Sequence, residues 1–222
     1  MGDIHKNRII TEYFEKTISE YLEFDVSELY EVADRCVIFG GCIRDIISLE
    51  QNHINDVDII THSKSCAGIG NLLLCHGYTQ VLLENDVRNS LYDETHLIFE
   101  PHTYTKGDKT VQLIRPSDSY VYDFMKIVSN VDLSSSGIYY DGHSIKESIN
   151  NAIFLTMAKQ FFVIEGALMY NESRVIKRKS KLLNRDWEEM GEIFMVDASR
   201  SRHILEYMSR QVNINYILYN GE

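Results

Sequence analysis

The sequence predicts an α+β fold in which a mixed β-sheet is followed by a helical C-terminal segment. Short apolar strands alternate with helical patterns up to about residue 145, and a hairpin pattern surrounds Gly107. Strand patterns then stop, and helical patterns fill the rest of the chain. A hairpin joins antiparallel strands, while strand–helix–strand units favour parallel ones, so the sheet should be mixed. We expect two regions, residues 1–147 and residues 148–222.

Each element follows from a local pattern. Apolar residues at helical spacing, with acidic residues on the other face, predict an amphipathic N-terminal helix. Short apolar runs predict buried strands, and glycines end several elements. The predicted order of the first region is helix 6–32, strand 36–39, helix 42–50, strand 56–63, helix 65–77, strand 78–85, hairpin 96–116, helix 120–129 and strand 131–142. The predicted helices of the C-terminal region cover 149–170, 172–194 and 197–212.

Composition is typical of a soluble globular protein. Hydrophobic residues make up 44% of the chain and charged residues 25%, and the formal net charge is -11. A surface of this charge repels nucleic acid unless basic residues gather locally. The four cysteines lack metal-binding spacing, and the chain has neither a signal-peptide pattern nor an apolar run of about 20 residues. We therefore expect a cytoplasmic protein with no membrane partner.

Two glycines separate the strand 36–39 from the helix that follows it. Gly40 and Gly41 leave the backbone free of side chains, so a bulky anion can approach it, and the helix directs N–H groups to the same place. Phosphate is the anion that fits this environment. Arg44 lies one turn into the helix and can bind phosphate oxygens through both arms of its guanidinium. Phosphate would repel Asp45, so we interpret Asp45 as a residue that orients Arg44.

Two aspartates lie on the next predicted strand. Residues two apart on a strand point to one face, so Asp56 and Asp58 can bind a common divalent ion. Mg²⁺ prefers a few carboxylates together with phosphate oxygens and water. A glycine turn or an Asp-x-Asp pair alone is most often a plain turn or a solvated strand edge. Their combination predicts a nucleotide–metal site in which Asp56 and Asp58 hold the metal and are catalytic.

These motifs resemble those of a known family. The stretch GGCIRD, followed ten residues later by DVDI, resembles the signature of the head domain of the tRNA nucleotidyltransferase (CCA-adding) and bacterial poly(A) polymerase family, within the DNA polymerase β superfamily. The segment NVDLSSSGIYYDG lines up with a second motif of that family and places Asp132 at its nucleotide-contacting aspartate. The likeness covers roughly residues 30–145.

The resemblance implies a polymerase β-like head that binds a nucleoside triphosphate. Its triphosphate would lie on Gly40, Gly41 and Arg44, and Asp56 and Asp58 would hold two Mg²⁺ ions. The acceptor hydroxyl, expected to belong to an RNA 3′ end with tRNA as one candidate, would attack the α-phosphorus and release pyrophosphate. A protein or small-molecule acceptor is the other reading of such a short chain.

Departures from the family motifs favour a second hypothesis. Gln112 stands where the family has a third carboxylate, so metal binding is weakened or another acid, Glu100 or Asp123, takes part. The helical body after the head is cut to about 75 residues. The other replaced positions are Asn130 and Val131, in place of paired arginines, and Ser136, in place of asparagine. The second hypothesis is a catalytically impaired relative that binds nucleotide, RNA or a protein partner as a regulator.

A basic segment in the C-terminal region is the best candidate for an RNA contact in this acidic chain. On a helix, Arg174, Arg178, Lys181 and Arg185 fall on one stripe. The predicted RNA-binding residues are Arg174, Lys177, Arg178 and Lys181. The alternative is that this helix pairs with the acidic N-terminal helix.

Other reactive residue types are interpreted as structural. Trp187 is expected in the core rather than as a platform for base stacking. The serines Ser134 to Ser136 lack the context of a nucleophile elbow and are predicted to be strand residues that line the pocket. Cys42 lies in the phosphate turn, where packing is the simpler role, although a helix N-terminus can lower the pKa of a thiol. The eight histidines show no zinc-binding spacing.

Overall fold

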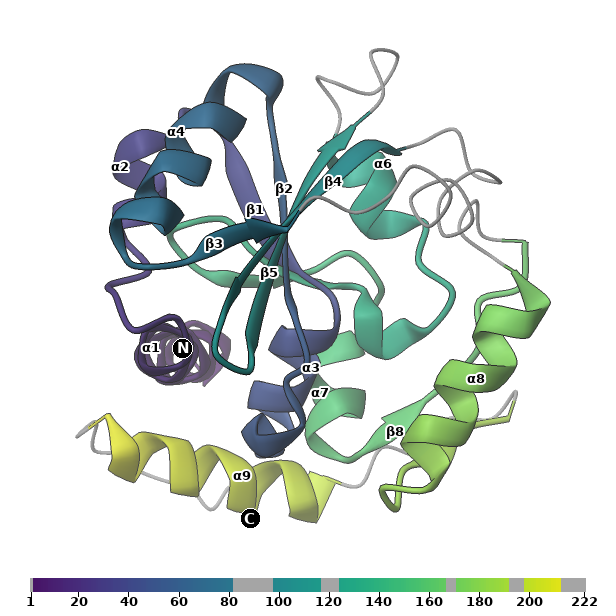
Figure 1. The fold of residues 1–222 in the computed structure, drawn as a ribbon. Coiled ribbons are helices and arrows are strands. Elements are labelled where there is room, and N and C mark those ends of the chain that lie inside the picture. Colours follow the sequence, from purple (N-terminus) through teal and green to yellow (C-terminus); the bar gives the residue numbers. More distant parts are fainter. Residues whose placement is uncertain (1, 82–97, 117–123, 167–170, 192–197, 213–222) are drawn as a thin grey trace.

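A seven-stranded mixed sheet forms the centre of the fold (Figure 1). The computed structural model describes residues 2–81, 98–116, 124–166, 171–191 and 198–212. The strands lie in the order β3-β4-β5-β2-β1-β6-β7. Their bounds are β1 Cys36–Phe39, β2 Val57–Thr61, β3 Thr79–Val81, β4 Ile98–Lys106, β5 Lys109–Pro116, β6 Ile138–Tyr140 and β7 Ile145–Glu147. Strands β2 and β5 pair in parallel and the other neighbours pair antiparallel, which confirms the predicted mixed sheet.

Helices pack on both faces of this sheet, most of them on one face, and a small second sheet joins two segments of the C-terminal region. The helices are α1 Gly2–Leu22, α2 Glu28–Val32, α3 Gly41–Ile47, α4 Ser63–Cys75, α6 Phe124–Ser129, α7 Ala152–Met157, α8 Glu172–Leu183 and α9 Ala198–Gln211. Two short 3-10 turns cover Gln51–His53 and Ser134–Ser136. Strands β8 Gln160–Phe161 and β9 Glu188–Glu189 form the second sheet, in parallel. None of the described helices has both the length and the low polarity needed to span a bilayer.

The two faces of the main sheet carry different clusters of buried side chains. On one face Ile38, Ile59 and Leu113 belong to the large core, which also takes side chains from α1, α3, α4, α7 and α9. On the other face Ile60 and Ile114 pack in a small cluster with residues of α6. Because side chains alternate along a strand, Asp58 lies on the same face as Ile60. The candidate site is therefore on the face with the smaller core.

Several predicted elements are wrong in detail. The N-terminal helix 6–32 is two helices, since Glu23 adopts a left-handed conformation with φ of 62° directly after α1. The predicted strand 131–142 begins with a 3-10 turn over Ser134–Ser136, so these serines are not strand residues. Parts of the predicted elements 78–85 and 120–129 lie outside the described residues.

The C-terminal region contains strands that were not predicted. The predicted helix 149–170 ends at Met157 and is followed by β8, and Lys159 has a φ of 55°, which a continuing helix cannot accommodate. The predicted helix 172–194 ends at Leu183 and is followed by β9. The third predicted helix, 197–212, is confirmed as α9. Side chains of α7 and α9 belong to the large core, and the division of the chain after residue 147 stays a prediction.

Candidate functional site

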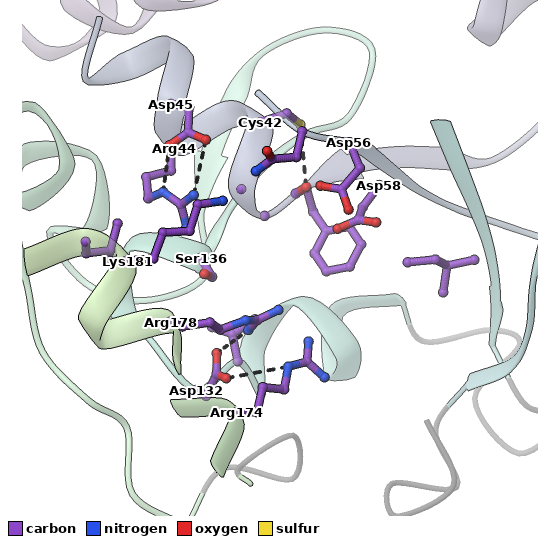
Figure 2. Close-up of a pocket in the computed structure, with 17 residues that line it drawn as sticks. Cys42, Arg44, Asp45, Asp56, Asp58, Asp132, Ser136, Arg174, Arg178 and Lys181 are labelled. Atoms are coloured by element: carbon purple, nitrogen blue, oxygen red, sulfur yellow. Dashed lines mark hydrogen bonds and ion pairs between the residues drawn. The ribbon is translucent and has the colours of Figure 1, made fainter. Parts of the chain in front are cut away.

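A cavity of about 230 Å³ lies where β1 passes into α3, and α8 closes one side of it (Figure 2). It brings together five segments of the chain: the glycine turn, the start of β2, β5, the segment before β6, and α8. The lining residues are Phe39, Gly40, Gly41, Cys42, Arg44, Asp45, Asn55, Asp56, Asp58, Ile114, Val131, Asp132, Ser136, Arg174, Arg178, Lys181 and Leu182. Most of the residues predicted from the sequence therefore meet in one place.

The glycine turn leaves a notch in the backbone beside the carboxylates. Gly40 has a φ of 81°, a conformation that residues with a Cβ rarely adopt. A Cβ added at Gly40 would lie 3.7 Å from Oδ2 of Asp58, and one added at Gly41 would lie 3.4 Å from Nη2 of Arg44. The notch is thus bordered by a carboxylate on one side and a guanidinium on the other.

The two predicted metal ligands lie side by side in the cavity (Figure 2). Asp58 is the second residue of β2, whereas Asp56 lies one residue before the strand begins, so the prediction that both are strand residues is wrong for Asp56. Burial, followed by the charge of Asp56, raises the pKa of Asp58 to about 7. Burial also raises the pKa of Asp56, although Lys181, Arg178 and Arg44 act in the opposite direction. The nearby cations therefore do not offset the effect of burial, and a divalent cation bound to both carboxylates would favour their charged form.

Gln112 lies next to Asp58 in the sheet. The two residues are Cα partners on the parallel strands β2 and β5, so their side chains project from the same face. Within the part of the chain that the structure describes, no three His, Cys, Asp or Glu side chains form a metal-binding cluster. Of the two substitute acids, Asp123 lies outside the described residues, and Glu100 is described only in its backbone pairing with Arg115.

Arg44 is held at the edge of the cavity by its neighbour. Nε of Arg44 donates to Oδ1 of Asp45 at 3.0 Å, and Nη2 donates to Oδ2 at 3.2 Å. Asp45 is thus placed to orient Arg44, as the sequence suggested. Cys42 is buried and its thiol lies 3.7 Å from the carbonyl oxygen of Phe39. Burial, together with Asp58, raises the pKa of this thiol, which is the opposite of the lowering that a helix N-terminus could cause.

Asp132 lies at the opposite wall, under α8. Its side chain is fully buried, and Nη1 of Arg178 donates to its Oδ1 at 2.6 Å. Nε of Arg174 lies 3.9 Å from its Oδ2, which accepts no hydrogen bond. The basic stripe of α8 therefore faces into the cavity through Arg174, Arg178 and Lys181, while Lys177 is exposed and does not line it. Figure 1 shows α8 far from α1, so the alternative pairing with the N-terminal helix is wrong.

Sequence reasoning missed a buried ionic cluster next to the cavity. Arg185, which follows α8, donates to Oδ1 of Asp45 at 2.7 Å and pairs with Glu50. Glu50 also contacts Nζ of Lys159 at 2.6 Å and accepts a hydrogen bond of 2.9 Å from the indole of Trp187. Trp187 is buried, as predicted. Arg185 belongs to the predicted basic stripe, but nothing in the spacing of the sequence indicates that it meets Glu50.

Comparisons with known proteins give a match only at the level of structure. Neither protein-family profiles nor curated proteins match the chain. A CCA-adding enzyme in an apo form aligns with a TM-score of 0.58 at 11% identity, over 92% of this chain and 45% of that one. A CCA-adding enzyme complexed with ATP aligns with a TM-score of 0.55 at 11% identity, over 88% of this chain and 42% of that one. The Thermotoga maritima CCA-adding enzyme complexed with tRNA aligns with a TM-score of 0.54 at 10% identity, also over 88% of this chain and 42% of that one.

These comparisons confirm the resemblance as a similarity of fold. The chain shares its fold with the aligned part of these CCA-adding enzymes, in agreement with the resemblance seen in the motifs. It spans less than half the length of the three structures, whose chains are covered over 42% to 45%.

Proposed function

We propose that this protein is a Mg²⁺-dependent nucleotidyltransferase that moves a nucleoside monophosphate from a nucleoside triphosphate to an acceptor. The observation that carries the proposal is the single cavity in which the Gly40–Gly41 notch, Arg44 and the pair Asp56 and Asp58 meet. One side of this cavity carries Arg44, Arg174, Arg178 and Lys181 together with the paired acids Asp45 and Asp132, and the other side carries the acids Asp56 and Asp58. A nucleoside triphosphate bound to a divalent cation matches that division of charge.

The cationic side suits the triphosphate. Arg44 and the α8 residues Arg174, Arg178 and Lys181 line the cavity together. Burial is the largest cause of the lowered pKa of Lys181, and the charges of Arg44 and Arg185 act in the same direction, against those of Asp45 and Asp56. An anion bound among these groups would relieve the repulsion. We therefore assign the three α8 residues to the phosphates of the nucleotide, and an RNA contact by the exposed Lys177 stays a prediction.

The acidic side suits Mg²⁺. Asp56 and Asp58 would hold the ion together with phosphate oxygens, and Gln112, which is not among the residues that line the cavity, is the sheet partner of Asp58 on the adjacent strand. When bound, Mg²⁺ would stabilise negative charge on the attacking and leaving oxygens. The protein itself contributes position and charge: Gly40 and Gly41 admit the phosphates, and Arg44 fixes their orientation.

The reaction proposed is an in-line displacement at phosphorus. The acceptor hydroxyl loses its proton to solvent, its oxygen bonds to the α-phosphorus, the bond from that phosphorus to the bridging oxygen breaks, and pyrophosphate leaves. An RNA 3′ end is the acceptor we propose, with tRNA as one candidate. The support comes from structural neighbours that were solved with ATP or with tRNA.

One observation favours a second function. Gln112, a neutral residue, is the partner of Asp58 in the sheet, so the site has one negative charge fewer than three carboxylates would give. In the second function the protein binds the nucleotide without transferring it and acts as a regulator. The two functions share the same cavity and differ in turnover.

Labelled nucleotides separate these functions. The full chain is incubated with Mg²⁺, each labelled NTP and RNA, and label is followed in RNA and in protein. Transfer to RNA that is lost in Asp58→Ala supports the proposed enzyme, and label on a protein points to a protein acceptor. Calorimetric binding of NTP without any transfer supports the regulator. Absence of both transfer and binding would refute the proposed function.

A further inference from the structure

A buried ionic cluster connects the phosphate-binding Arg44 to the chain after α8. Asp45 is 2% exposed, and its Oδ1 accepts from both Arg44, at 3.0 Å, and Arg185, at 2.7 Å. The Arg185 side chain is only 8% exposed and also pairs with Glu50. Two guanidinium groups therefore share one carboxylate oxygen, and the position of either one depends on that carboxylate.

Glu50 is fixed in turn by groups from the C-terminal region. Lys159 contacts its Oε1 at 2.6 Å, and the indole of Trp187 donates to its Oε2 at 2.9 Å. Burial raises the pKa of Glu50, but these partners and Arg185 outweigh it and lower the pKa to about 2. Glu50 is thus ionised over the whole physiological range. Its backbone N–H also donates to the carbonyl oxygen of Asp45 at 2.6 Å, which joins the two acids through the main chain.

The backbone around this cluster is strained. Leu49, Lys159 and Asp186 have φ values of 61°, 55° and 59°, in the left-handed region that residues with a Cβ rarely adopt. Each of them belongs to the cluster or is adjacent to one of its members. Such conformations cost about 1–3 kcal/mol each and persist where the surrounding contacts impose them. The surrounding contacts therefore hold these residues in backbone conformations that cost free energy locally.

We propose that Arg185 and Glu50 are positioning residues: through Asp45 they fix the guanidinium of Arg44 in the orientation that receives the nucleotide phosphates. The inference rests on the proposed function, in which Arg44 binds phosphate. In this arrangement Asp45 uses both oxygens on Arg44, and Arg185 stops the carboxylate from rotating away. The C-terminal region thereby takes part in the phosphate site through a residue that does not line the cavity.

The proposal is tested by whether two substitutions in the cluster weaken or strengthen phosphate binding. Binding of inorganic tripolyphosphate to the full chain is measured by calorimetry for Glu50→Gln and Arg185→Lys. Charge alone predicts tighter binding for Glu50→Gln, which removes a negative charge, and no change for Arg185→Lys. Loss of positioning predicts about tenfold weaker binding for both. The matched control is Glu189→Gln, which removes an acid that pairs with Lys179 on α8 and does not contact the cluster.

A second readout does not depend on binding. Solvent exchange of the Nε proton of Arg44 is followed by NMR, with the exposed Arg35 as reference. In the wild type we expect exchange at Arg44 to be at least about tenfold slower than at Arg35, because its N–H is buried and hydrogen-bonded. We expect about tenfold faster exchange at Arg44 in Glu50→Gln and Arg185→Lys, and no change in Glu189→Gln.

The two readouts separate the inference from the function on which it rests. If tripolyphosphate does not bind to the wild type but exchange responds as expected, the proposed function fails and the positioning role stands. The positioning role is overturned if the Nε proton of Arg44 exchanges as fast as that of Arg35 in the wild type. It is also overturned if exchange at Arg44 is the same in both cluster variants as in the wild type. Binding as tight as wild type or tighter in folded Glu50→Gln and Arg185→Lys overturns it as well.

Discussion

The substitution Asp58→Asn should stabilise the protein at alkaline pH when no divalent cation is present. Burial and Asp56 raise the pKa of Asp58 from its ordinary value of 3.8 to about 7. The unfolded chain therefore loses this proton first, and the folded state becomes progressively less stable as the pH rises from about 4 to about 7. At about 1.36 kcal/mol for each pH unit, the cost above pH 7 is about 4 kcal/mol. Because the side chain at position 58 is only partly buried and an amide there also needs hydrogen bonds, we expect a gain of about 2 kcal/mol.

Denaturant unfolding at about pH 5 and about pH 8 measures this effect. Wild-type stability should fall between the two pH values, and that of Asp58→Asn should fall less. Saturating Mg²⁺ should restore the stability of the wild type at the higher pH, because an ion that binds only the folded state stabilises that state. It should have little effect on the stability of Asp58→Asn. Asp34→Asn, at an exposed aspartate, is the matched control and should follow the wild type. An Asp58→Asn variant that is less stable than wild type at pH 8 without metal would refute the reasoning.

Three further substitutions test other parts of the site. Gly40→Ala should lose about 1–3 kcal/mol in unfolding free energy because of the φ of 81°, and wild-type stability would contradict the assigned turn. Gln112→Glu should bind Mn²⁺ about tenfold more tightly by calorimetry, because it adds a carboxylate beside Asp58, and unchanged affinity would separate Gln112 from the metal site. Arg178→Met leaves the buried Asp132 without its 2.6 Å partner and should cost about 2 kcal/mol of stability, which adding Asp132→Asn should largely restore.

Local patterns predicted the acidic and glycine-containing half of the site. A short apolar run that ends in two glycines is typical of a buried strand followed by a turn. The Asp-x-Asp pattern at the start of an apolar run indicates a strand with one polar face. The hairpin around Gly107 also follows from a local pattern, whereas the pairing of β5 with β2, which places Gln112 beside Asp58, joins distant parts of the chain, and Gln112 was indicated only by the family resemblance. The locally predicted elements are set by residues within a few positions of one another, which is the range over which a sequence pattern carries information.

Local patterns could not predict the C-terminal half of the site. Strands β8 and β9 have two residues each, too few to show a period. The basic stripe of α8 was visible as a pattern, but its partner Asp132 is 46 positions away from Arg178. Likewise 135 positions separate Arg185 from Glu50. Only the folding of the chain decides that this stripe closes the cavity rather than lying on the surface.

The most direct test of the central claim is a crystal structure with a non-hydrolysable NTP and Mn²⁺. We predict that the triphosphate lies against Gly40, Gly41 and Arg44, and that the anomalous signal of Mn²⁺ marks an ion bound to Asp56 and Asp58. A nucleotide bound elsewhere on the protein, or Mn²⁺ bound without these two carboxylates, would contradict the account.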